Sequence, residues 1–169
     1  MKYLDTAFAQ LEFAIKLMQA AEDGRIKRED IDLPLTISEG SSVLVLADQV
    51  IHTDTDFINA LQNNVSMAFG AAAITLNQCR EEMKISLPIT INTELEQWIS
   101  LVYQIRNAFA HNIAEPIWKI KPKYARHFQV NSVSINLSSL NKQHFNYDQL
   151  GGAKALFLLR DYGRTHLLF

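Results

Sequence analysis

The sequence has very little cysteine and no long run of apolar residues. Cys79 is the only cysteine, so an internal disulfide is excluded, and its place on the apolar face of a predicted helix indicates a packed thiol. The apolar run at residues 65–76 is far shorter than the roughly 20 residues that span a bilayer, which predicts no membrane helix. Asp5, Glu12 and Lys16 interrupt the first apolar positions, so we expect no signal peptide and a cytoplasmic protein.

Several motifs with well-known chemistry are also missing. There is no CxxC pair, no HExxH helix and no Walker loop, and the glycine pair at 151–152 lacks the spacing of a nucleotide fingerprint. The histidines outside the segment discussed below are scattered, so neither a metal site nor a cofactor is predicted. Asp54 and Asp56 follow His52, but helix capping explains these aspartates more simply than a metal cluster does.

The length and composition predict one domain whose charge is unevenly divided. The 169 residues are 48% apolar and 20% charged, as in a soluble globular domain. Residues 1–116 hold 8 Lys and Arg against 16 Asp and Glu, whereas residues 117–169 hold 8 against 2. This asymmetry indicates either a basic face that meets a polyanion or two halves that attract one another.

Apolar periodicity predicts a helical core in the first two thirds of the chain. Helical spacing covers residues 4–21, continues from caps at 53–55 to about Lys84, and returns from Thr93 to Ile113. Small residues in the middle of the second helix would let another helix come close. Between the first two helices, β-branched residues on either side of a Ser-Glu-Gly-Ser-Ser turn predict a small hairpin insertion.

The last third of the chain changes to a period of two. Strands are predicted at 118–121 and 133–137, and a final helix at 153–162 that ends before Gly163. The fold class is therefore mainly α with a small C-terminal β appendage. We expect one domain, 1–169, with a helical core at 1–116 and a basic β/helix appendage at 117–169.

The segment 103–112, YQIRNAFAHN, places an arginine where a helix should be apolar. Arg106 falls near the middle of a predicted stripe made of Leu95, Trp98, Ile99, Val102, Ile105, Phe109 and Ile113. A guanidinium keeps its proton, so it needs an anion or a ring of acceptors. The partner is either a ligand or a carboxylate of this chain, for which Glu94, Glu96 and Asp48 are candidates.

A histidine follows this arginine at a spacing that does not suit a straight helix. On such a helix, Arg106 and His111 would lie about 140° and about 7.5 Å apart. They converge if the helix ends near His111, or if two copies of the helix meet across a two-fold axis. The alternative is a histidine that only interacts with the helix C-terminus.

The pattern Arg106, Asn107, three residues, His111 resembles the R-x(4–6)-H signature of the HEPN superfamily, in which a polar residue often follows the arginine. The resemblance covers mainly the helices before the histidine. It implies a HEPN-like antiparallel helical bundle and a homodimer whose subunits each contribute one motif to a shared cleft. It also implies a metal-independent endoribonuclease in which Arg106 binds phosphate, Asn107 orients and His111 exchanges the proton.

Proteins of this superfamily are often toxins of toxin–antitoxin or phage-defence systems, and some are neutralised by an antitoxin of the nucleotidyltransferase type. The resemblance therefore also implies a toxin or defence role and a possible antitoxin partner of the nucleotidyltransferase type. The alternative is a non-catalytic HEPN-type dimerisation and interaction module, in which Arg106 and His111 only organise the dimer interface.

A basic and aromatic segment follows the motif directly. The expected RNA-binding residues are Lys119, Lys121, Lys123, Tyr124 and Arg126, with the rings of Trp118 and Tyr124 as stacking faces. The alternation of lysine with apolar residues also fits, and slightly favours, a second interpretation. In it, the segment is an edge strand with a solvated lysine face and a buried aromatic face.

Overall fold

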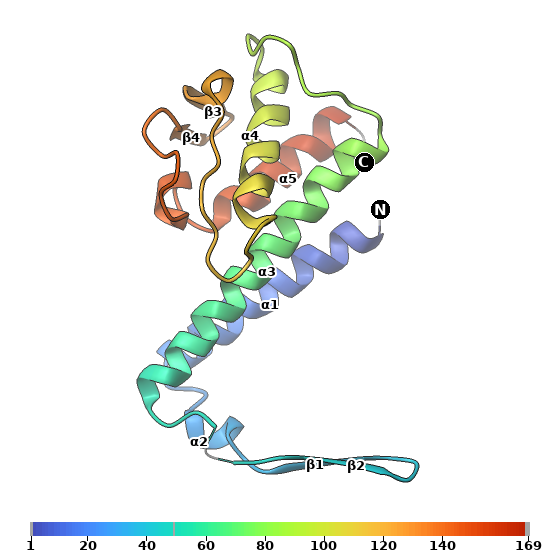
Figure 1. The fold of residues 1–169 in the computed structure, drawn as a ribbon, viewed down its shortest axis with the longest axis vertical. Coiled ribbons are helices and arrows are strands. Elements are labelled where there is room, and N and C mark those ends of the chain that lie inside the picture. Colours follow the sequence, from blue (N-terminus) through green and yellow to red (C-terminus); the bar gives the residue numbers. More distant parts are fainter. Residues whose placement is uncertain (1, 49, 168–169) are drawn as a thin grey trace. The chain divides into compact units, whose positions relative to one another are not determined.

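The structure, a computed structural model, describes residues 2–48 and 50–167 and is mainly α-helical (Figure 1). Two small antiparallel β-hairpins interrupt the helices. The elements in chain order are α1 (Lys2–Glu22), α2 (Arg28–Ile31), β1 (Leu35–Glu39), β2 (Ser42–Leu46), α3 (Asp54–Glu82), α4 (Glu94–Phe109), a 3-10 turn (Pro122–Tyr124), β3 (His127–Val130), β4 (Val133–Asn136), a second 3-10 turn (Tyr147–Leu150) and α5 (Lys154–Leu167). No helix in the described part of the chain has an apolar stretch long enough to cross a membrane.

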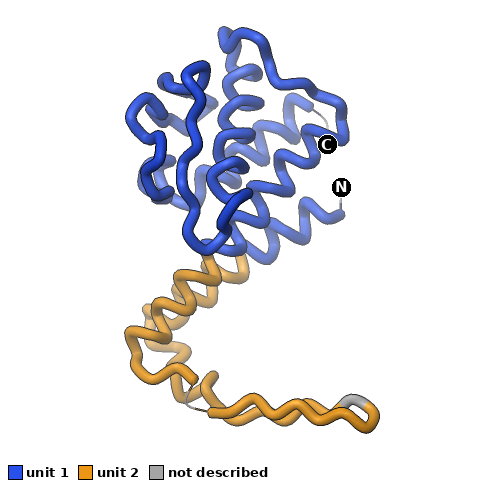
Figure 2. The backbone as a smooth tube through the Cα atoms, viewed as in Figure 1, with its two compact units in different colours: residues 1–11, 66–169 blue, residues 12–65 orange. Residues whose placement is uncertain are grey.

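The chain divides into two compact units, which Figure 2 shows in different colours. Unit 1 comprises residues 1–11 and 66–169, and unit 2 comprises residues 12–65. The helices α1 and α3 each contribute residues to both units. The expected boundary at residue 116 does not separate compact units, because the C-terminal segment belongs to the same unit as α4.

Helix α3 begins where the sequence predicts a cap. The Asp56 main-chain N–H donates to the Thr53 hydroxyl at 3.1 Å, and the Thr53 N–H donates to the Asp56 carboxylate at 3.0 Å. This reciprocal pair satisfies two free donors of the first turn. The capping interpretation of Asp56 is confirmed, and no group of acidic, histidine and cysteine residues that could hold a metal occurs among the described residues.

The core of unit 1 is built around α4, which contacts both β3 and α5. The Trp98 indole donates to the Leu159 carbonyl at 2.6 Å and so ties α4 to α5. The predicted close approach of two helices occurs at Gly70, where a Cβ atom would lie 2.6 Å from Cδ1 of Phe109. The largest fully buried side chains of the unit include Trp98, Trp118, Phe8, Phe69, Phe109 and Phe128.

Unit 2 contains the predicted N-terminal hairpin. Strand β1 pairs with β2 from Leu35↔Leu46 to the turn pair Glu39↔Ser42, which confirms the hairpin insertion. The Asp32 carboxylate accepts the main-chain N–H groups of Val50 and Ile51, at 3.1 and 3.2 Å, and so joins the two ends of the insertion.

The C-terminal third differs from the prediction in three places. The segment 118–121 forms no regular strand; the isolated bridge Ile117↔His144 and main-chain hydrogen bonds of Trp118 with residues 142 and 143 join this region to the chain near residue 143. Strand β4 matches the prediction to within one residue, whereas β3 was not expected. Helix α5 continues through Gly163, which is buried and therefore packs in the helix rather than ending it.

Candidate functional site

The motif helix ends earlier than its apolar pattern indicates. Thr93 caps α4, whose last residue is Phe109, so the predicted end at Ile113 is wrong. The side chain of Asn112 accepts the N–H groups of Ala114 and Glu115, at 3.1 and 3.2 Å, and forms a turn instead of a further helical turn. His111 is therefore outside the helix.

This early end brings Arg106 and His111 to one cavity. The cavity has a volume of about 600 Å³ and lies wholly within unit 1. Its lining consists of Tyr103, Arg106, Asn107, His111, Ile117, Trp118, Lys119, Ile120, Lys121, Asn141 and Lys142. The first of the two convergence routes, a helix that ends near His111, is confirmed. A second copy is not needed to place both residues on one wall.

Arg106 is less buried than the sequence indicates and has no ion pair among the described residues. Its Nη1 donates to Oδ1 of Asn107 at 3.1 Å. Two of the expected carboxylate partners are used elsewhere, since Glu94 accepts the Asn131 N–H and Glu96 accepts the N–H groups at the start of α4. The guanidinium is thus held by an amide and keeps donors free for a ligand in the cavity.

His111 is exposed, and its ring makes no hydrogen bond in the described part of the chain. The main-chain N–H of Ala110, not the His111 ring, donates to the Arg106 carbonyl at the helix end. Among the described residues, the His111 ring therefore makes no hydrogen bond with the end of α4. An exposed imidazole beside an arginine can exchange a proton with a bound ligand.

Three lysines give the cavity a basic rim, and one of them was missed by the sequence analysis. Lys119, Lys121 and Lys142 are all exposed and line the cavity. The Lys142 N–H donates to the Trp118 carbonyl at 2.8 Å, and its φ of 67° turns the chain there. The Asn141-Lys-Gln turn was visible in the sequence, but nothing local indicates that it pairs with residues about 20 positions earlier.

The other two basic residues of the segment lie elsewhere. Lys123 donates to the Pro88 carbonyl, and Arg126 donates to the Ile91 carbonyl at 2.8 Å. Both carbonyls belong to the connection between α3 and α4, so these side chains fasten that connection. Neither residue lines the cavity.

The expected stacking faces are not available. Trp118 is 0% exposed and Tyr124 is 5% exposed, and the Trp118 indole donates to Gln149 at 2.7 Å. Stacking of bases on these two rings was therefore a wrong expectation. The two rings are buried and Lys119 and Lys121 are exposed, which is the side-chain pattern of the second interpretation, but the segment forms no regular strand.

A buried arginine lies near the site and was not predicted. Arg80 in α3 is 4% exposed and donates to Oδ1 of Asn77 at 3.1 Å and to Glu81 at 3.0 Å. Burial lowers the pKa of Arg80, the charge of Glu81 opposes this, and the positive charge of Arg106 lowers it further. Arg80 forms an ion pair with Glu81, so its charge is already balanced within the chain.

Cys79 behaves as a structural thiol. It is fully buried, its Sγ contacts the Tyr3 hydroxyl at 3.6 Å, and burial raises the pKa of the thiol. A raised pKa disfavours the thiolate that a nucleophile needs. The expectation of a packed thiol is confirmed.

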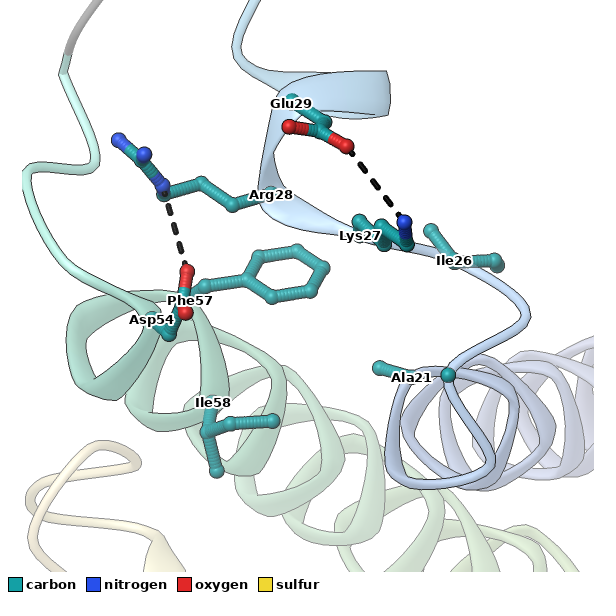
Figure 3. A pocket seen from close by; sticks show the side chains of 9 residues that line it. Ala21, Ile26, Lys27, Arg28, Glu29, Asp54, Phe57 and Ile58 are labelled. Atoms are coloured by element: carbon teal, nitrogen blue, oxygen red, sulfur yellow. Dashed lines mark ion pairs between the residues drawn. The ribbon is translucent and has the colours of Figure 1, made fainter.

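A second cavity, of about 410 Å³, lies in unit 2 (Figure 3). Its charged residues are paired with each other, Arg28 with Asp54 at 3.5 Å and Lys27 with Glu29 at 3.7 Å. Nη1 of Arg28 also donates to the Ile51 carbonyl at 3.0 Å. This cavity lacks the excess of unpaired cations that marks the cavity at Arg106, which makes it the weaker candidate for binding an anion.

No protein-family model, curated protein or solved structure matches the chain. The resemblance to the HEPN superfamily therefore rests on the Arg106 to His111 sequence motif alone.

Proposed function

We propose that this protein is a metal-independent endoribonuclease whose active site is the cavity at the end of α4. The observation that carries the proposal is that Arg106, Asn107 and His111 line one cavity of a single chain. This is possible because α4 ends at Phe109, before His111. The HEPN resemblance supplies the reaction class.

The proposed reaction is a transesterification within the RNA chain. The His111 imidazole removes the proton of a ribose 2′-hydroxyl, and the resulting oxygen attacks the adjacent phosphorus. The bond from phosphorus to the 5′ oxygen then breaks, and that oxygen takes a proton from solvent. The products are a 2′,3′-cyclic phosphate and a 5′-hydroxyl end.

Arg106 stabilises the negative charge that develops on the phosphorane. Its planar fork can donate two parallel hydrogen bonds to the non-bridging oxygens. Asn107 already accepts from Nη1 of Arg106, so its role in the proposal is to orient the arginine. Lys119, Lys121 and Lys142 would bind the phosphates on either side of the one that reacts.

The test is incubation of purified protein with total RNA and a labelled tRNA pool in EDTA. His111→Ala should lower the cleavage rate about 100-fold to 10,000-fold, the usual contribution of a general base. Arg106→Ala should lower it about 100-fold or more. His52→Ala, an exposed histidine of unit 2, is the matched control and should cleave like the wild type.

Product ends identify the mechanism. Cyclic phosphate ends that disappear in both site variants support the proposal, whereas equal cleavage by all four proteins overturns it. Absence of cleavage by the wild type, with an unchanged fold in circular dichroism, would favour the non-catalytic interaction module instead.

The homodimer and the toxin role enter the proposal through the resemblance alone. Since one chain already lines the cavity with Arg106 and His111, a second copy would extend the site rather than complete it. Light scattering at micromolar concentration tests the dimer, and a monomeric mass would remove it from the proposal. Growth arrest on expression, relieved by a nucleotidyltransferase-type antitoxin, would be the corresponding test of the toxin role.

A further inference from the structure

The exposed apolar residues of this protein are concentrated in one short segment. Nine large aliphatic side chains between residues 31 and 50 are exposed, while the remaining exposed large apolar side chains of the described residues are isolated ones such as Met67 and Ile89. The nine are Ile31, Leu33, Leu35, Ile37, Val43, Leu44, Val45, Leu46 and Val50. Exposed apolar side chains that are concentrated in this way are typical of an interaction site.

The register of the first hairpin places four of these residues on one face. Opposite residues in an antiparallel pair point to the same side, so the pairs Leu35↔Leu46 and Ile37↔Leu44 share a face. We name these four residues the aliphatic face. Their side chains are 45–55% exposed. The opposite face contains Thr36 and Ser38 beside two valines and is half polar.

The geometry of the aliphatic face selects the kind of structure that can cover it. A two-stranded hairpin with an apolar face is marginally stable in water unless another layer packs on it. A strand added at the edge would leave the face in water. An α-helix, about 10 Å wide with its side chains, spans both strands, which lie about 4.8 Å apart.

The charge of the surrounding unit selects the chemistry of the partner. Residues 12–65 hold 4 Lys and Arg against 10 Asp and Glu, a net charge of −6. Two such units placed face to face repel each other, and an anionic lipid surface repels either one. Unit 1 of a second copy is basic, but the large apolar side chains that its described residues expose, Tyr3, Met67 and Ile89, form no matching patch.

We propose that the aliphatic face of the first hairpin is the docking site for an amphipathic, basic helix of another protein. Leucine-like side chains of that helix would cover the aliphatic face, and its lysines and arginines would meet acidic residues of unit 2 such as Asp30 and Asp48. This site is separate from the cavity at Arg106 and does not depend on the proposed ribonuclease activity.

The probe for this docking site is a labelled helical peptide with leucine along one face and lysine on the other, measured by fluorescence anisotropy with the full chain. The double variant Ile37→Thr/Leu44→Thr should weaken its binding about tenfold or more, because these residues form the centre of the aliphatic face. The matched control Val43→Thr/Val45→Thr alters the opposite face and should change the affinity less than about threefold. A peptide with glutamate in place of lysine should bind at least about tenfold more weakly.

Four results would overturn the proposal. Equal loss in both double variants, or no binding of the lysine peptide, would show that the aliphatic face does not select this ligand. A dimer in light scattering that only the Ile37→Thr/Leu44→Thr variant breaks would make a second copy the occupant. Binding to phosphatidylcholine/phosphatidylglycerol vesicles, lost in the same variant, would make it a membrane.

Discussion

The two hairpins of this protein have the same local geometry and opposite surroundings. In each, a two-residue turn contains a residue in the left-handed region, Gly40 with φ 60° in the first and Asn131 with φ 48° in the second. Glycine and asparagine are the residues that adopt this conformation at the lowest cost. The turns therefore form for the same local reason, whatever the strands pack against.

The strands differ in where their apolar side chains go. In β3 and β4 the alternation is complete: Phe128, Val130, Val133 and Ile135 are buried and the residues between them are exposed. In β2 every residue is exposed. The second hairpin is covered by α4. The Gln129 N–H of β3 donates to the side-chain oxygen of Gln97 in α4 at 2.8 Å. The same element of structure thus has its partner inside the chain in one case and, by our proposal, outside it in the other.

The largest test of this difference is a pair of matched truncations. Phe128→Ala should lower the free energy of unfolding by about 3–5 kcal/mol, because a fully buried ring leaves a cavity in unit 1. Ile37→Ala should lower it by less than about 1 kcal/mol, because its side chain is already 45% exposed. Urea denaturation followed by circular dichroism measures both. An equally large loss for Ile37→Ala would mean that the chain itself covers the first hairpin.

Those elements that are set by local patterns could be predicted from the sequence. The first hairpin follows from β-branched runs around a glycine turn, and the start of α3 follows from the Thr53 and Asp56 cap. The Arg106 to His111 motif was also visible, and its two convergence routes included the one that occurs.

The residues that sequence reasoning misplaced depend on tertiary contacts. Counting aliphatic residues put Arg106 in the middle of the buried stripe, but Ser100 and Gln104 are also buried, so the buried face of α4 is centred elsewhere. Arg106 consequently lies at the edge of that face and lines the cavity. Lys142 and the buried Arg80 were missed because long-range packing, which has no sequence period, places each of them.

Charge also distinguishes the two units, since unit 1 is basic and unit 2 is acidic. The next largest effect is on the affinity of the basic unit for RNA. Lys119→Gln/Lys121→Gln should weaken binding of a single-stranded RNA about tenfold and reduce the salt slope of the affinity by about 1.4, since each lysine contacts one phosphate and each contact with a single strand contributes about 0.7. Lys123→Gln/Arg126→Gln removes the same charge beside β3 but not from the cavity, and should change the affinity less than about threefold. Fluorescence anisotropy across a salt series measures both. Equal losses would assign RNA binding to the whole basic segment rather than to the cavity.

The smallest effect lies at the start of α4, the helix that covers the second hairpin. Main-chain N–H groups of Thr93 and Asn92 hold the pKa of the Glu96 carboxyl below its ordinary value of 4.5. The folded state therefore favours the charged carboxylate, and this stabilisation is present above pH 4.5 and is lost as the pH falls through the lower folded value. Glu96→Gln should lower the Tm by a few degrees at pH 7 and by less at pH 3.

Thr93→Ala is the control for this pH dependence, because it removes a cap acceptor that does not titrate. Its Tm loss should be similar at pH 7 and pH 3, and a loss that shrinks as much as that of Glu96→Gln would contradict the assignment to the carboxylate. Glu94, in the same first turn, accepts the Asn131 N–H from the turn between β3 and β4. Loosening the first turn of α4 by either substitution should therefore speed amide hydrogen exchange in β3 and β4. Exchange in β1 and β2 should stay unchanged, since only the second hairpin packs on α4.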